Sequence, residues 1–340
     1  MKISFLLVNT LIVATLNGCF GTDPAVENFS NYQQRLANVL DTERLPLHKA
    51  VDIALPRKRD LVLPLEDVRM GLLDAYELRE CGLFQLVADR NSILGKVQDA
   101  FRQLDYEVKL LRTLERCLDL VEDPTLTATL KEIQAHKRRQ IQTVYWNTFI
   151  ASDAWRKQLT PPSSAMIPPE APLPHSDALL AITAYTNAMI SPGSNLNIIA
   201  MQEPIEKQRY LGALFYSMDE STRWLNTITQ QLERDDSQVI CGANRDKTRL
   251  NYLRNVFDTF FVGDIQPYLS KINSLYLDVQ PALEALDGQL PKTTPFLAYS
   301  DAYLGGAHYQ DFQLSIKNHV GYWQSLFKRC QLQVGNQAKK

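Results

Sequence analysis

The sequence predicts an all-α fold, a multi-helix bundle built from antiparallel helical hairpins. Along most of the 340 residues, apolar side chains recur at spacings of three and four, the period of an amphipathic helix. Strand-like alternation is nearly absent. Aspartate or serine precedes several of these periodic segments, twice with proline directly after aspartate, and this pattern is typical of helix N-termini.

The expected helices follow one another through short connections. They cover 24–40, 65–90, 101–118, 124–150, 152–159, 176–190, 204–232, 244–276, 294–305 and 312–330. The second and third form an antiparallel hairpin with its tip at 91–97. Three prolines between 46 and 64 mark an extended connector in which 61–63 is the strand-like piece, and Pro267 predicts a kink.

A proline-rich stretch at 160–175 divides the chain. Its six prolines forbid regular structure and favour a stiff, extended link. It separates an N-terminal helical region, 19–159, from a C-terminal one, 176–332, which a polar tail follows at 333–340. Two subdomains and one continuous bundle crossed by the link both remain open, because the length fits either.

The first 18 residues have the pattern of a secretory signal peptide. Lys2 and an apolar run over 3–16 lead to the tetrad Leu16-Asn17-Gly18-Cys19, in which a small residue precedes a cysteine as in a lipobox. We therefore expect a lipid on Cys19. A transmembrane anchor, which needs about 20 apolar residues, and a cleaved soluble protein are the alternatives. Phe20 stands where an aspartate would signal inner-membrane retention, so the outer membrane is favoured.

Lipidation of Cys19 leaves an even number of cysteines, as expected in an oxidising compartment. We prefer the pairs Cys81 with Cys117 and Cys241 with Cys330, because each pair lies on one side of the proline-rich stretch. The two loop closures would contribute about 4 and about 4.6 kcal/mol. Buried free thiols and metal ligation are the alternatives, although no C-x-x-C spacing supports a metal.

The charge balance excludes one class of partner. The formal net charge is −2, so the chain has no electrostatic footprint for nucleic acid. The basic runs at 57–59 and 137–139 are expected to be solvated faces, with contact to an anionic lipid or polymer as the alternative. The expected partners are the membrane, through acyl chains, and an envelope protein or the cell wall.

The usual catalytic patterns are missing from the sequence. The five histidines have no zinc-binding spacing and are expected in surface or capping roles, with a weak site across helices as the alternative: His48, His136, His175, His308 and His319. The stretch 191–194 resembles a plain turn rather than a nucleophile elbow, and no phosphate-binding pattern occurs. We therefore assign no catalytic, cofactor-binding or metal-binding residue.

Acidic side chains on the 65–90 helix are the candidates for enzyme chemistry. A glycosidase needs two carboxyl groups about 5–9.5 Å apart, and a solvated helix face is the alternative explanation. The acids concerned are Asp74, Glu77, Glu80 and Asp89.

Amide and charged residues inside or beside apolar helices form the most suggestive polar set. They are Asp89, Arg90 and Asn91 at the hairpin tip, Trp146 and Asn147, and Arg254 and Asn255. Buried polar groups need hydrogen-bond partners, so these residues are expected to meet in a network that fixes helix register. The alternative is a ligand groove in which Trp146 forms a stacking wall.

Several sequence blocks resemble a family of Gram-negative bacterial lipoproteins catalogued only as a domain of unknown function. The most specific are RECGLFQLVADRNS at 79–92 and RNVF at 254–257. The others are YEVKLLRTLERCL at 106–118, VYWNTF at 144–149 and YWQSLFKRCQL at 322–332. The resemblance implies lipidation, an envelope location and helical architecture. It implies no activity and no catalytic residue.

The expected function is therefore that of an outer-membrane-anchored periplasmic lipoprotein, a non-enzymatic interaction or envelope-maintenance protein. One alternative is a cell-wall or glycan hydrolase or lyase that uses helix-borne carboxylates, which would require two convergent acids in a cleft. Another is a carrier of a small apolar ligand, which would require an enclosed apolar cavity.

Overall fold

The computed structural model describes residues 23–50, 53–66, 78–92, 98–160, 166–170, 176–192, 196–242 and 245–332. All regular elements within these ranges are helical, which confirms the all-α prediction. The signal segment, Cys19 and the tail at 333–340 lie outside the described residues. Among the residues described, no helix has both the length and the apolar character needed to cross a bilayer.

The chain forms long helices joined by short helical segments. The helices are α1 (Pro24–Leu40), α2 (Lys58–Leu61), α4 (Leu83–Asn91), α5 (Ala100–Leu120), α6 (Pro124–Ala151), α7 (Asp153–Leu159), α8 (Ser176–Ile190), α9 (Ile198–Lys207), α10 (Tyr210–Arg234), α11 (Thr248–Val256), α12 (Gln266–Gln289), α13 (Leu297–Tyr299) and α14 (Ala307–Arg329). Within the described residues, the 3₁₀ segments are η2 (Asp236–Gln238) and η4 (Thr294–Phe296), and the π-helical segments are η3 (Phe257–Ile265) and η5 (Ser300–Leu304).

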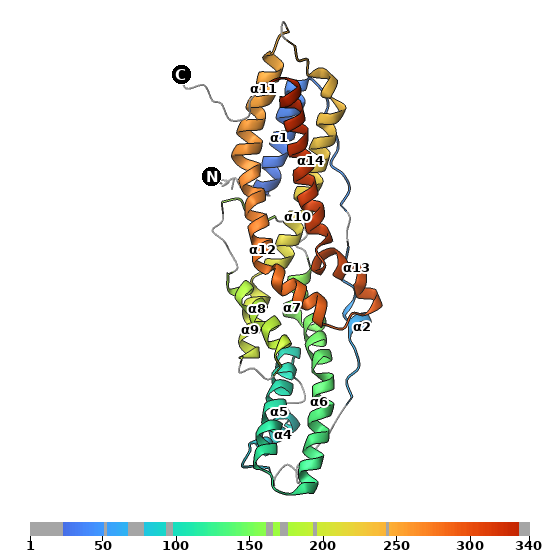
Figure 1. The fold of residues 1–340 in the computed structure, drawn as a ribbon, viewed down its shortest axis with the longest axis vertical. Helices are drawn as coiled ribbons and strands as arrows, with labels where there is room; N and C mark the ends of the chain where they lie inside the picture. Colours follow the sequence, from blue (N-terminus) through green and yellow to red (C-terminus); the bar gives the residue numbers. More distant parts are fainter. Residues whose placement is uncertain are drawn as a thin grey trace, which may run out of the picture.

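The molecule is elongated (Figure 1). In its upper part α1, α10, α14 and the continuous helix of α11, η3 and α12 pack side by side. The hairpin of α5 and α6, with α4 against α5, forms the lower end, and α7, α8, α9 and α13 lie between the two ends. The connector after α1 runs down the side of the molecule past α2 (Figure 1).

Helix N-termini are capped largely where the sequence predicts. The carboxylate of Asp23 accepts a hydrogen bond from Ala25 N at 2.9 Å, and that of Asp123 accepts one from Thr125 N at 2.7 Å. Ser152 Oγ accepts from Trp155 N at 3.3 Å. These side chains satisfy backbone N–H groups that have no partner inside their helix.

The main core runs through both predicted helical regions. One buried cluster contains residues from α1, α5 and α6 together with residues from α8 to α14, and a smaller one lies around Cys81 and Cys117. Within the proline-rich stretch, Met166 and Ile167 are themselves buried. Asp23 accepts a hydrogen bond from Met166 N at 2.6 Å, and Ser217 accepts one from Ile167 N at 2.8 Å. This described part of the stretch is thus docked on the core.

The predicted helix at 65–90 is confirmed at 83–90, which belongs to α4, and is wrong at 65–66 and 78–82. Residues 62–66 form no helix, 67–77 lie outside the described residues, and α4 begins only after a turn at 78–82. Gly82 has φ +85°, a conformation that glycine adopts without steric cost. Arg116 Nε donates to the carbonyl of the preceding residue, Cys81, at 2.8 Å and so holds the turn in place.

The long helix predicted to begin at Pro204 begins instead at Tyr210. Pro204 lies inside α9, and residues 208–209 interrupt the helical structure between α9 and α10. The buried side chain of Gln158 bridges the break: it donates to Ile205 O at 2.7 Å and accepts from Leu211 N at 3.0 Å. A distant side chain therefore supplies the partners that a continuous helix would have provided.

Asn147 fixes the connector against α6. Its amide donates to the carbonyl of Leu63 at 2.8 Å and accepts from the backbone N–H of the same residue at 2.9 Å. One residue earlier, Trp146 Nε1 donates to Leu61 O at 2.9 Å. Leu61 ends α2, so the predicted strand-like piece at 61–63 is extended only after that residue.

We predict that Asn147→Ala lowers the free energy of unfolding by about 1–3 kcal/mol, because it leaves two backbone groups of Leu63 without partners. Urea denaturation measures this loss. The matched control is Asn251→Ala, at an exposed asparagine of α11, which should change stability by less than about 0.5 kcal/mol. If the two variants lost the same amount of stability, the hydrogen bonds of Asn147 to Leu63 would not stabilise the fold as we predict.

Candidate functional site

The polar residues expected to form one network lie in three separate places. Asp89, Arg90 and Asn91 are on α4 at the lower end, Trp146 and Asn147 on α6, and Arg254 and Asn255 on α11 in the upper part (Figure 1). Helical periodicity placed each set on a helix but could not show which partners each set contacts.

Each of the three sets has local partners. Asp89 accepts a hydrogen bond from Gln85 at 2.7 Å, and the Arg90 guanidinium lies over the Tyr106 ring, 5.5 Å from its centroid. Asn91 is the last residue of α4.

Trp146 is fully buried, edge-on to Phe296 with ring centroids 5.1 Å apart. It therefore packs in the core and does not form the predicted stacking wall. On α11, Arg254 pairs with Asp258 at 3.5 Å, whereas Asn255 is exposed and lines a groove described below.

Acidic residues gather at a place the sequence analysis did not identify. Of its four candidate acids, Asp74 and Glu77 lie outside the described residues. On α10, Glu220 is buried and pairs with Arg223 at 2.5 Å. Burial raises the pKa of the Glu220 carboxyl group. The charge of Arg223 lowers this pKa, and the charges of Asp219 and Asp23 raise it. Glu220, Asp219 and Asp23 line neither of two surface grooves in the described part of the molecule.

Asp219 makes different contacts from its neighbour. Its carboxylate lies 2.5 Å from His308 Nδ1 and accepts from Tyr303 Oη at 3.3 Å. In the described residues, no three or more His, Cys, Asp or Glu side chains are grouped so that they could hold a metal ion.

His319 forms a buried polar junction between three helices. The prediction of a surface or capping role is wrong here, because this side chain is completely buried. Its Nε2 lies 3.0 Å from Tyr32 Oη on α1, and its Nδ1 lies 2.9 Å from Thr229 Oγ1 on α10. Trp323 Nε1, one turn later on α14, donates to Tyr32 Oη at 3.0 Å.

The donors and acceptors of this junction fix its protonation state. An indole N–H can only donate, and Trp323 Nε1 lies 3.0 Å from Tyr32 Oη and 3.2 Å from His319 Nε2. Nε2 of His319 is therefore an acceptor, which can also receive the hydroxyl hydrogen of Tyr32. The imidazole then carries its hydrogen on Nδ1, which faces Thr229. Burial lowers the pKa of His319 to about 3, which keeps the ring neutral at pH 7.

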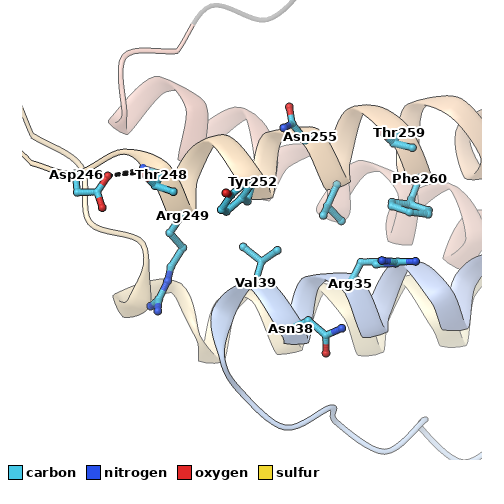
Figure 2. A pocket seen from close by; sticks show the side chains of 11 residues that line it. Arg35, Asn38, Val39, Asp246, Thr248, Arg249, Tyr252, Asn255, Thr259 and Phe260 are labelled. Carbon is cyan, nitrogen blue, oxygen red and sulfur yellow. Dashed lines mark hydrogen bonds between the residues drawn. The ribbon is translucent and has the colours of Figure 1, made fainter.

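A groove of about 670 Å³ runs between the second half of α1 and the helix formed by α11 and η3 (Figure 2). Val39, Tyr252, Val256 and Phe260 form its apolar floor. The polar residues around them are Arg35, Asn38, Asp246, Thr248, Arg249, Asn255 and Thr259. The residues come from helices more than 200 positions apart in sequence, so no local pattern could have predicted the groove.

The two ends of the groove carry positive charge. At one end the Arg35 guanidinium lies 5.6 Å from the centroid of the Phe260 ring, and at the other end Arg249 lies at the start of α11 (Figure 2). The one acid of the lining, Asp246, accepts from the backbone N–H and the hydroxyl of Thr248 at 2.8 and 2.6 Å. These hydrogen bonds lower the pKa of its carboxyl group and occupy one of its oxygens.

The π-helical segment η3 shapes one wall of the groove. It supplies Thr259 and Phe260, and its inner side supplies Phe261 to the core. The sequence predicted a kink at Pro267, whereas the irregularity in the structure precedes that residue. π-helical turns are rare and often lie at functional sites, which draws attention to this wall.

A second, smaller groove of about 320 Å³ lies at the end of α14. Tyr322 Oη donates to Asp236 at 3.0 Å, and Arg329 Nη2 donates to the same carboxylate at 2.9 Å. The Asp236 carboxylate of this groove is thus already paired with two side chains of α14.

The two predicted disulfides are confirmed. Cys81 is bonded to Cys117 and Cys241 to Cys330, each with Cα atoms 5.1 Å apart. The first joins the turn before α4 to α5. The second joins the segment between α10 and α11 to the end of α14, and so braces the chain that leads into Asp246 and Arg249 at the groove.

Together these features define a class of protein: an elongated, disulfide-braced, all-helical body with an exposed interhelical groove. The chain belongs to the family described as "Protein of unknown function (DUF3080)", which matches residues 29–334. No curated protein and no solved structure matches the chain. The family confirms the resemblance at the level of a domain of unknown function.

We predict that His319 makes the protein less stable in acid. The pKa of this group is about 3 in the folded state, against an ordinary histidine value of 6.5 in the unfolded chain. The unfolded chain therefore binds one more proton between these two pH values. Stability therefore falls as the pH drops below about 6.5, by about 1.4 kcal/mol between about pH 7.5 and 5.5 from this residue.

Urea denaturation of the wild type and His319→Gln at both pH values tests this prediction. The variant should lose less stability on acidification, by about that amount, even if it is less stable overall. His48→Gln, at an exposed histidine, serves as the control and should lose as much stability as the wild type when the pH is lowered. An unchanged pH dependence in His319→Gln would show that the imidazole is not held neutral.

Proposed function

We propose that this protein is an outer-membrane lipoprotein that faces the periplasm and acts by binding an envelope partner, without catalysing a reaction. The observation that carries the proposal is the tetrad Leu16-Asn17-Gly18-Cys19 after an apolar segment. Disulfides support export, because they persist in oxidising compartments outside the cytoplasm.

Cysteine pairing supports a separate role for Cys19. The chain has five cysteines, and the other four are bonded to each other. Cys19 is therefore left without a cysteine partner in its own chain, which fits a thioether-linked lipid. Acylation by two or more chains gives stable membrane attachment, whereas a single chain gives only marginal binding.

The anchor would hold the body close to the bilayer. Asp23, the cap of α1, follows Cys19 by four positions, and even a fully extended chain of that length spans at most about 14 Å. Because α1 begins within the upper part of the molecule and not at its tip (Figure 1), a tether of this length would bring the side of the body near the membrane, rather than one end.

We predict that Cys19→Ala releases the protein from the membrane. In a Gram-negative host the wild type should fractionate with the outer membrane, with an intact mass above that of the polypeptide 19–340 by the mass of its acyl chains. Cys19→Ala should lack this added mass and leave the outer membrane. A second variant, Phe20→Asp, should keep the lipid and move to the inner membrane.

Two results would contradict the proposal. One is a wild-type protein whose Cys19 carries no lipid or is bonded to another cysteine. The other is a chemical crosslinking experiment on intact envelopes in which the anchored wild type gives no reproducible protein or cell-wall adduct.

A further inference from the structure

We propose that the groove between α1 and α11–η3 binds a short, extended acidic peptide segment, with an anionic side chain at each end and an apolar side chain between them. The proposal names a partner chemistry for the interaction role above, and it rests on that role only for the source of the peptide. The argument uses the floor, the charges and the length of the groove.

The floor of the groove is apolar and open to solvent. Tyr252 is 57% exposed although it is a large aromatic side chain. Val39 and Phe260 are only partly buried beside them. An aliphatic side chain laid on this floor would remove apolar surface from water on both partners.

Two arginines flank this floor, and their present hydrogen bonds are long. Arg35 Nε donates to Asn31 at 3.3 Å, and Arg249 Nη1 donates to the backbone and side-chain oxygens of Gln238 at 3.4 Å. A guanidinium offers five N–H donors in a planar fork, and a carboxylate is its best-matched partner. Each arginine can therefore gain a shorter, charge-assisted pair from an acidic ligand.

The charge around the groove favours an anion. Its lining carries Arg35 and Arg249 against Asp246 alone, and the carboxylate of Asp246 is already engaged by Thr248. The segment 245–249 contains three basic side chains and one acid, and all are exposed. This excess of positive charge attracts acidic segments and repels basic ones.

The length of the groove sets the spacing of the two acids. Phe260, which lies under Arg35, follows Arg249 by 11 residues on one continuous helix, a rise of about 16 Å. An extended peptide advances about 3.3 Å per residue and places i, i+2 and i+4 on one face. Acids at i and i+4 are about 13 Å apart, within reach of two long arginine side chains, and i+2 faces the floor.

Fluorescence anisotropy with the full-length protein in detergent tests the proposal. The probe is a labelled peptide with blocked ends and the sequence Glu-Ser-Leu-Ser-Glu. Control peptides carry lysine at both ends, or serine in place of the central leucine. We expect saturable binding of the first peptide, none of the lysine peptide, and weaker binding of the serine peptide.

Variants place the peptide in the groove. Arg35→Ala and Arg249→Ala should each weaken binding about tenfold or more, as loss of a charge-assisted pair requires. Tyr252→Ala should weaken it through the floor alone. The matched control, Arg139→Ala, removes an exposed arginine on α6 and should bind as the wild type does. Circular dichroism melting confirms that each variant is folded.

Two outcomes with the wild type would overturn the inference: no saturable binding, or equal binding of the acidic and lysine peptides. Two outcomes with the variants would also overturn it: equal affinity of Arg35→Ala and Arg139→Ala for the acidic peptide, or an affinity that Tyr252→Ala does not change. The last result would indicate a site that binds anions through charge alone. Failure here is distinguishable from failure of the proposed function. A lipid-free Cys19 with intact peptide binding would remove the anchor and leave the groove, whereas the reverse would leave an anchored protein with a different binding surface.

Discussion

The neutral imidazole of His319, buried where α1, α10 and α14 meet, is the contact on which the upper part of the structure depends. It ties Tyr32 of α1 to Thr229 of α10, and the ring of Phe261 packs against it with centroids 4.7 Å apart. Tyr32 lies one turn before Arg35, and Phe261 directly follows Phe260. The same junction therefore holds together the helices that form the two walls of the groove.

The rest of the molecule supports this arrangement by joining segments distant in sequence. The Cys241–Cys330 disulfide joins the segment between α10 and α11 to the end of α14, and Asn147 holds the connector along the side of the molecule. Gln158 bridges the break before α10, so that α10 can start at Tyr210 and present Thr229 to the junction. The two side chains supply hydrogen bonds that regular helices do not provide at these places, and the disulfide restricts the freedom of the chain.

Sequence reasoning succeeded where the cause of a structure is local. The caps at Asp23 and Asp123 and the helical periodicity depend on a few neighbouring residues, and the disulfide pairs followed from their placement along the chain. It failed where the cause is remote. His319 has the spacing of an ordinary helix residue, and only the packing of α1 and α10 against it makes it buried. The groove could not be predicted for the same reason, since its walls meet only in the folded chain.

The central claim is that the groove beside Tyr252 contacts an acidic segment of another envelope protein while the chain is anchored. Photocrosslinking in cells measures this directly, with a photoreactive amino acid at Tyr252 and, as a control, at Leu314, an exposed residue of α14 outside the groove lining. The account predicts a discrete adduct from position 252 alone, mapped to a segment with acids four residues apart. The same adducts from both positions, or none from position 252, would contradict it.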